Sequence, residues 1–206
     1  MKLTLMKAMM NYYNHNAKQL FDKYQSLDPD KVHASWLRHL PQNPGLALDV
    51  GGGSGRDAAW LAKRGWEVIV VEPATVLLEL GQKATEVYPV AWVNDCLPTL
   101  VELQKYRHSF SLILVSGVLM HLPYQQRIDS METLAGLMAY NSLLVVSLRH
   151  GPDSEGREFY QVPADEIVQF AEKKSLQAEV TNTLEDVLER DGVTWQTIIV
   201  EKRVFR

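Results

Sequence analysis

Two patterns of hydrophobic and polar residues alternate along this chain. Short, mainly apolar runs such as "LALDV" (46–50) are separated by longer segments in which apolar residues recur every three or four positions. A short apolar run is typical of a buried strand, and the wider spacing is typical of an amphipathic helix. The strands predicted in the middle of the chain are 46–50, 67–73, 90–95, 110–118 and 142–149. The helices predicted between them are 56–64, 75–88, 98–106 and 124–140.

The two ends of the chain follow a different order. Before the first strand, the spacing predicts helices over 16–28 and 31–40, ended by prolines. After Pro163 it predicts a helix over 164–176 and then two strands, 177–183 and 193–205, with no strong helix between them. Two late strands connected in this way indicate an antiparallel pair at one edge of the sheet.

Strands that are apolar on both faces and separated by helices indicate a parallel sheet covered on both sides. We therefore predict an α/β fold with a doubly wound, mostly parallel sheet and right-handed crossovers. A chain of 206 residues is long enough for one domain with a substantial core, whereas two domains would both be undersized. The expected organisation is a single domain over 1–206, with 1–43 as an N-terminal helical cover.

Composition and charge narrow the class of protein. The formal net charge of -4 argues against non-specific binding to nucleic acid, which usually requires a positive surplus. The single cysteine, Cys96, excludes an internal disulfide or a thiolate metal cluster, and we expect no metal site. Lys7 interrupts the apolar residues at the N-terminus, and no stretch reaches the roughly 20 apolar residues of a membrane helix. A cytoplasmic protein without a membrane segment is expected.

The turn "DVGGGSG", from Asp49 to Gly55, joins the first predicted strand of the sheet to the helix that follows. In a doubly wound sheet, ligands bind at the carboxyl ends of the strands, where this turn lies. A dinucleotide-binding turn reads G-x-G-x-x-G, but Arg56 occupies the place of the third glycine, and a phosphate-binding loop ending in G-K-[ST] is absent. Asp49 would repel a pyrophosphate and attract a cation.

Further carboxylates end the next two predicted strands. S-adenosylmethionine (SAM) carries an ammonium and a sulfonium, which suit Asp49. Glu72 has the position from which a carboxylate accepts hydrogen bonds from ribose hydroxyls, and Asp95 could accept one from the adenine amino group. The alternatives are a solvated strand end for Glu72 and a cap of the helix near Pro98 for Asp95.

These motifs resemble those of the class I SAM-dependent methyltransferases, as in small bacterial-type domains of that family. "LDVGGGSGRD" is similar to the family's first motif, "VVEP" to its ribose-binding motif, "NDCLP" to its adenine-binding segment and "LVSGVLMHLP" to its fourth-strand motif. The resemblance covers the chain from about Tyr12 to the C-terminal strands. It implies a Rossmann-like, seven-stranded sheet with helices on both faces and an antiparallel last strand.

The resemblance also implies which residues bind the cofactor. The glycine turn would hold the methionyl group, Glu72 the ribose, and Asp95, Cys96 and Leu97 the adenine, while Ser116 and Gly117 would line the methyl-donor site. The complete implied set is Asp49, Gly51, Gly52, Gly53, Gly55, Arg56, Glu72, Pro73, Asp95, Cys96, Leu97, Ser116 and Gly117. Cys96 is interpreted as a small filler near the adenine rather than as a nucleophile.

Four residues are candidates for the acceptor side of the site. His121 follows the fourth-strand motif, and its ordinary pKa near 6.5 suits a general base, although it could equally pack against the cofactor or cap the turn before Pro123. Arg149 and His150 end the fifth strand of the sheet, where arginine could bind an acidic substrate or merely hold a loop by salt bridges. Tyr24 lies on the apolar face of a predicted helix and is a candidate lid residue, or simply part of the core.

The sequence thus predicts an enzyme that transfers a methyl group from SAM to an acceptor, most simply a small molecule. The chain lacks the Asn/Asp-Pro-Pro-aromatic motif of enzymes that methylate adenine or glutamine amino groups. The N-terminal helices and residues 151–163 are expected to cover the acceptor. Two other classes remain open: a SAM-binding regulatory module without catalysis, and an NAD-dependent oxidoreductase.

Overall fold

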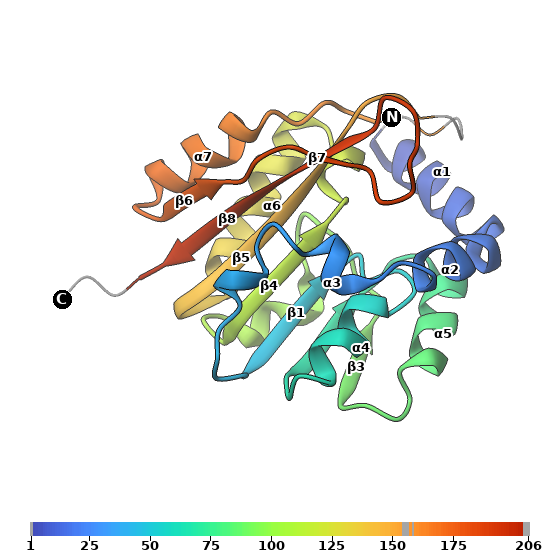
Figure 1. The fold of residues 1–206 in the computed structure, drawn as a ribbon, viewed down its shortest axis with the longest axis horizontal. Helices are drawn as coiled ribbons and strands as arrows, with labels where there is room; N and C mark the ends of the chain where they lie inside the picture. The colour runs from blue at the N-terminus through green and yellow to red at the C-terminus, as the bar shows by residue number, and fades with distance from the viewer. Residues whose placement is uncertain (1, 154–156, 158, 204–206) are drawn as a thin grey trace.

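The computed structural model describes residues 2–153, 157 and 159–203. Its centre is a sheet of eight strands in the order β3-β2-β1-β4-β5-β8-β6, with the short β7 paired to β8 (Figure 1). The strands are β1 (Leu46–Val50), β2 (Glu67–Val71), β3 (Val90–Val93), β4 (Phe110–Ser116), β5 (Met138–His150), β6 (Gln177–Val180), β7 (Leu184–Glu185) and β8 (Thr194–Lys202). The predicted fold class, a mostly parallel α/β sheet that ends in antiparallel strands, is confirmed.

Helices precede the sheet and connect its strands. The α-helices are α1 (Lys2–His15), α2 (Ala17–Gln25), α3 (Pro29–Val32), α4 (Arg56–Ala62), α5 (Thr75–Ala84), α6 (Tyr124–Leu137) and α7 (Ala164–Lys173). The 3₁₀ helices are η1 (Leu37–His39), η2 (Val101–Tyr106) and η3 (Leu119–His121). None of the helices in the described part of the chain is both long and apolar enough to cross a membrane.

Two layers of side chains cover the sheet, one on each face. Alternate residues of β1 show the division: Leu48 and Val50 pack with η2, α6 and α7, whereas Ala47 packs with α4 and the buried Trp36. Both layers are visible in Figure 1, with α4 on one side of the strands and α6 on the other. Burial on both faces explains why the central strands are nearly continuous apolar runs.

The strand order reverses between β1 and β4, and the register aligns their carboxyl ends. Val50 at the end of β1 pairs with Val71 of β2 on one side and with Val115 of β4 on the other. The residues that follow these three strands therefore meet at one edge of the sheet. A reversal of strand order is where open α/β sheets bind ligands.

Several predicted elements differ from the observed ones. Residues 31–40 do not form one helix, because the chain turns after α3 and places His33 and Trp36 against α4, with only η1 helical beyond them. Residues 98–106 form η2, a 3₁₀ helix, rather than an α-helix. Helix α1 and strand β7 were not individually predicted, and the predicted strand 193–205 runs past the described residues.

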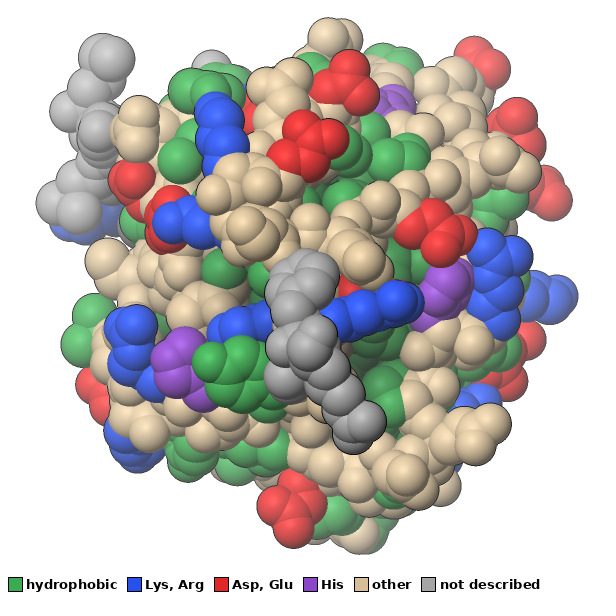
Figure 2. All heavy atoms as spheres, turned by 90° about the vertical axis from the view of Figure 1, so that its left-hand side faces the viewer, with side chains coloured by type: hydrophobic (Ala, Val, Ile, Leu, Met, Phe, Trp, Pro, Cys, Tyr) green, Lys and Arg blue, Asp and Glu red, His purple; other side chains and the backbone are tan. Residues whose placement is uncertain are grey.

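One side of the molecule carries mixed charge. Figure 2 views the side that lies to the left in Figure 1, and acidic and basic side chains are interspersed over it. This distribution agrees with the slightly acidic balance of the whole chain.

Candidate functional site

A pocket opens at the carboxyl ends of β1, β2, β4 and β5, covered by residues of α1, α2 and α3 and by the segment around β7. It brings together most residues of the predicted site. The predicted residues in its lining are Asp49, Gly51, Gly52, Gly53, Arg56, Glu72, Pro73, Cys96, Leu97, Ser116, Gly117, His121, Tyr24 and Arg149. Three others, Gly55, Asp95 and His150, are not part of it.

The glycine turn forms the floor of one end of the pocket. The backbone N–H groups of Gly51 and Gly52 both donate to the carbonyl oxygen of Val71, at 2.7 and 3.2 Å, which ties the turn to the end of β2. Gly51 has φ +69°, and a Cβ there would lie 2.7 Å from a methyl group of Val118. Only glycine meets both the backbone and the space requirement at this position.

Asp49 lies directly beneath this turn and is only 2% exposed. Its Oδ2 has no hydrogen-bond partner within the part of the chain that the structure describes. Burial, together with the negative charges of Asp57 and Glu72, raises the pKa of Asp49 well above its usual value, although Arg56 opposes this shift. A buried, unpaired carboxylate oxygen in a pocket is suited to a cationic group of a ligand.

Glu72 holds the turn from the end of β2. Its Oε2 accepts from the N–H of Gly53 at 3.0 Å, and its Oε1 accepts from the N–H of Ala74 at 2.9 Å. The side chain is 6% exposed, and burial raises its pKa against the effect of these two hydrogen bonds. A carboxylate oxygen has a second lone pair, so Glu72 can still accept hydrogen bonds from a ligand's hydroxyl groups.

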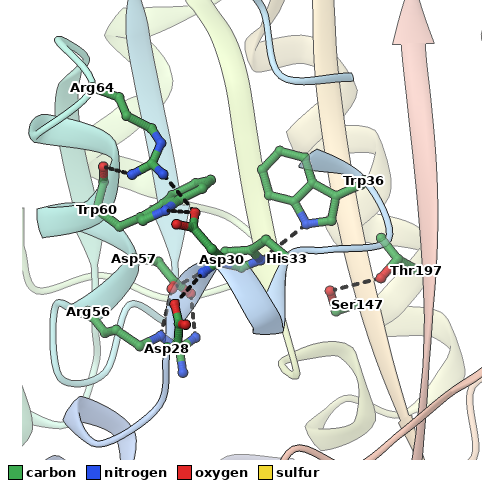
Figure 3. A network of polar contacts seen from close by, with 10 residues as sticks. All are labelled: Asp28, Asp30, His33, Trp36, Arg56, Asp57, Trp60, Arg64, Ser147 and Thr197. Carbon is green, nitrogen blue, oxygen red and sulfur yellow. Dashed lines mark hydrogen bonds and ion pairs between the residues drawn. The ribbon is translucent and has the colours of Figure 1, made fainter. Parts of the chain in front are cut away.

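Arg56 begins α4 and is paired with the next residue. Its Nε and Nη2 donate to the two oxygens of Asp57 at 2.7 and 2.8 Å, and Asp57 also lies 3.0 Å from Nε2 of the buried His33 (Figure 3). The positive charge of Arg56 and the contact with His33 hold the pKa of Asp57 below its usual value despite its burial. Asp57 therefore stays charged and fixes Arg56 beside Asp49.

A second set of contacts attaches the N-terminal segment to the same helix. The carboxylate of Asp30 accepts from Trp60 Nε1 at 2.8 Å and from Arg64 at 2.7 Å, and Nδ1 of His33 accepts from Trp36 Nε1 at 3.1 Å (Figure 3). Because Nδ1 accepts, the proton of a neutral His33 is on Nε2, which lies 3.0 Å from Oδ1 of Asp57 but outside hydrogen-bond geometry. Asp57, His33 and Asp30 were not identified from the sequence as part of this site.

The residues predicted to contact adenine divide into two groups. Pro73, Cys96 and Leu97 line the pocket, and burial raises the pKa of the Cys96 thiol, which keeps it protonated. Asp95 instead accepts from the N–H of Cys96 at 2.7 Å and from that of Glu102 at 2.9 Å, which agrees with the capping alternative. Gly55 faces α5, where a Cβ would lie 2.9 Å from Cγ2 of Thr85, so its neighbours are structural.

The other end of the pocket begins at Ser116, Gly117 and His121. Nε2 of His121 lies 3.0 Å from the hydroxyl of Tyr13, which also accepts from Arg157 Nη1 at 3.3 Å. The tautomer of His121 decides which of the two groups donates, and in either case the contact occupies Nε2. Burial and the nearby Arg157 lower the pKa of His121 to about 4, so it is neutral at pH 7.

Arginines characterise this second end. Arg149 shares it with Arg157 and Arg190, which each pair with an aspartate four residues earlier, Asp153 and Asp186 respectively. Trp195 Nε1 donates to the same Asp186 at 2.8 Å. The sequence did not single out these partners, because they come from loops without a local motif. Four residues of the predicted acceptor loop 151–163, namely 154–156 and 158, lie outside the described residues.

Metal ligands are not grouped in the described part of the chain. Its His, Cys, Asp and Glu side chains form no cluster of three or more that could hold a metal ion.

We compared the chain with known protein families and with curated proteins. A family model described as a methyltransferase domain matches residues 47–139, which include the glycine turn, Glu72 and His121. No curated protein matches the chain significantly.

Solved structures match over nearly the whole chain at low identity. A 1,6-didemethyltoxoflavin-N1-methyltransferase from Burkholderia thailandensis, with 1,6-didemethyltoxoflavin and S-adenosylhomocysteine bound, has a TM-score of 0.74 and 14% identity over 98% of this chain and 89% of that chain. Magnesium protoporphyrin IX methyltransferase from Synechocystis PCC 6803 has a TM-score of 0.69 and 15% identity, over 95% and 98%. A TehB-like SAM-dependent methyltransferase from Corynebacterium glutamicum has a TM-score of 0.66 and 18% identity, over 96% and 100%. Residues 47–139 therefore resemble a methyltransferase domain, and the chain has the fold of these solved methyltransferases.

Proposed function

We propose that this protein transfers the methyl group of SAM to a small-molecule acceptor, and that residues 1–43 form part of the same domain. The observation that carries the proposal is the unpaired, buried Oδ2 of Asp49 beneath the glycine turn. The toxoflavin and porphyrin enzymes named above support a small-molecule acceptor, since both have this fold and both names specify a small substrate.

The cofactor residues have separate tasks in this proposal. Asp49 would bind the ammonium, the backbone of Gly51 and Gly53 would approach the methionyl chain, and Glu72 would accept from the ribose. Cys96 and Leu97 would pack on the adenine. The fit is supported by the charges, because a cation placed beside Asp49 offsets the repulsion from Asp57 and Glu72.

SAM itself supplies an activated methyl group on a sulfonium, which leaves as a neutral thioether. The protein's main tasks are then to align the acceptor and exclude water. Ser116 and Gly117 would flank the reacting groups at the end of β4. His121 is neutral at pH 7, and Nε2 could take a proton from an acceptor only after its hydrogen bond with Tyr13 opens.

Equilibrium titration with SAM, S-adenosylhomocysteine (SAH) and NAD tests the cofactor assignment. We expect micromolar binding of SAM and SAH and none of NAD, because Asp49 would face the pyrophosphate and Arg56 replaces the third dinucleotide glycine. Binding of NAD alone would overturn the proposal. A tight SAM complex without methyl transfer to any member of an acceptor screen would favour the non-catalytic module.

A further inference from the structure

Arg149 differs from the two other arginines at the acceptor end of the pocket in its ion pairing. It is 7% exposed, and its Nε has no hydrogen-bond partner within the described residues. Arg157 and Arg190 line the same end, but each forms an ion pair at 2.7 Å with its own aspartate. No carboxylate described by the structure forms an ion pair with Arg149.

The neighbours of Arg149 hold its guanidinium without neutralising it. Nη1 and Nη2 donate to the carbonyl oxygens of Gly151 and Pro152, and the group lies 5.0 Å from the ring centre of Phe159. Carbonyl and aromatic contacts orient a cation but bring no negative charge. Asp153 and Asp186 act on Arg149 electrostatically, but each forms its ion pair with another arginine. A buried guanidinium without an ion pair of its own is suited to a negatively charged ligand.

Arg149 lies in the part of the pocket where the acceptor would bind. Along β5 it follows Ser147 on the same face of the sheet, and it pairs across the sheet with Trp195 of β8. The ring of Trp195 in turn lies against Gly117, where a Cβ would be 3.1 Å away. Arg149 is therefore next to the end of β4, on the side away from the glycine turn.

The carboxylate of SAM is not a suitable partner for this arginine. That carboxylate is attached to the same carbon as the ammonium, so it must lie close to Asp49. β4 separates β1 from β5, which places the two strands about 10 Å apart. The guanidinium is held further out, by carbonyls beyond the end of β5.

We infer that the methyl acceptor carries a carboxylate and that Arg149 binds it through the Nε edge of its guanidinium. Arg149 carries one positive charge that forms no ion pair with a described residue, and the single charge of a carboxylate matches it better than a phosphate dianion would. The planar guanidinium can donate two parallel hydrogen bonds to a carboxylate, a geometry that lysine lacks. This inference rests on the proposed function of the same pocket.

Calorimetric titration of the SAH-loaded protein at pH 7.5 with benzoate and with benzamide tests it, and acetate and acetamide form a second pair of matched probes. We expect the acid of at least one pair to bind at least tenfold more tightly than its amide. In R149Q this preference should fall below twofold while the affinity for SAH stays within twofold of wild type, which also shows that the variant is folded. R149K should keep part of the preference.

Lys31→Gln is the matched control, because Lys31 lines the same pocket and its loss removes the same charge. It should retain the full preference for the acid. The inference is overturned if the wild type shows no preference for an acid in either pair, or if R149Q retains it. A tenfold loss of SAH affinity in R149Q would assign the arginine to the cofactor's carboxylate instead. Absence of SAH binding by the wild type would instead refute the proposed function.

Discussion

The two ends of the pocket are built in different ways. The end that we propose for the cofactor is made of backbone from one turn and of two carboxylates, Asp49 and Glu72, at the ends of neighbouring strands. The end that we propose for the acceptor is made of long side chains from α1, η3, β5 and the loops around them, including Tyr13, His121 and Arg149. The first end is encoded by a contiguous sequence motif, whereas the residues of the second end come together only when the chain folds.

Charge follows the same division. Burial raises the pKa of Asp49 and Glu72 at the cofactor end, and burial with neighbouring arginines lowers that of Arg149 at the acceptor end. Each end therefore holds a charge that its own surroundings do not stabilise. We interpret both charges as binding sites for ligand groups of opposite charge, a cation at one end and an anion at the other.

The largest effect is expected for Asp49→Asn. Removing one partner of a buried charge pair costs about 2–5 kcal/mol, so the affinity for SAH should fall by roughly 30-fold or more. The same change should stabilise the free protein, because it removes a desolvated charge that faces Asp57 and Glu72. Calorimetry and thermal unfolding measure the two effects, and a rise of about 2–4 °C corresponds to roughly 1 kcal/mol in a chain of this size.

The pH dependence of this stabilisation gives a separate check. The pKa of Asp49 is higher in the folded state than in the unfolded chain, so its destabilising contribution is absent at low pH. That contribution appears as the pH rises from about 4 through the raised folded pKa. The advantage of Asp49→Asn should grow over this window, and an advantage that is the same at every pH would contradict the account.

A smaller loss of cofactor affinity is expected for Glu72→Gln. The amide keeps one oxygen, so it cannot accept from Gly53, Ala74 and the ribose as the carboxylate does. Charge-assisted hydrogen bonds contribute about 1.5–3 kcal/mol, which predicts a decrease of roughly 10- to 150-fold in SAH affinity. An unchanged affinity in the calorimeter would remove Glu72 from the ribose site.

Two glycine substitutions separate binding from stability within one turn. Both glycines have positive φ, +55° at Gly53 and +76° at Gly55, so alanine should cost about 1 kcal/mol or more at either position. A Cβ on Gly53 would reach the pocket, and one on Gly55 would lie against Thr85 and Trp92. Gly53→Ala should therefore weaken SAH binding more, and Gly55→Ala should lower the unfolding temperature more. The reverse order would contradict the placement of the two residues.

The smallest effect concerns His121 and appears only below neutral pH. Its pKa is about 4 in the folded protein and near 6.5 when unfolded, so stability is unaffected above pH 6.5 and is lost as the pH falls toward 4. His121→Gln should reduce this loss, measured as the unfolding temperature at pH 7 and at pH 5. An equal loss in both proteins would show that His121 is not held neutral.

The fold was largely predictable, because each central strand is apolar on both faces and each helix between them is polar on one. Where prediction failed, side-chain contacts over a distance decided the structure. His33 and Trp36 pack against Trp60 of α4 and end the helix that the local spacing favours. Strand β7 pairs with β8 and has two residues, too few to show the alternation of apolar and polar residues that predicts a strand.

The site residues that lie in one short segment or at the ends of strands could be predicted from the sequence, whereas contacts between distant segments could not. Asp49, Glu72 and the first glycines are fixed by one turn and by strand ends that the register aligns. Asp95 shows the opposite case, since its carboxylate caps the start of η2, as the helix-cap alternative had it. The pairing of Asp57 with His33 joins residues far apart in sequence, and only the fold brings them together.

A crystal structure of the SAH complex tests the central claim most directly. The account predicts that the ammonium of the ligand lies within hydrogen-bond distance, about 3 Å, of Asp49 and that its ribose hydroxyls reach Glu72. Its carboxylate should leave Nε of Arg149 unoccupied. An ammonium bound away from Asp49, or a ligand carboxylate on Arg149, would contradict the division of the pocket into a cationic-ligand end and an anionic-ligand end.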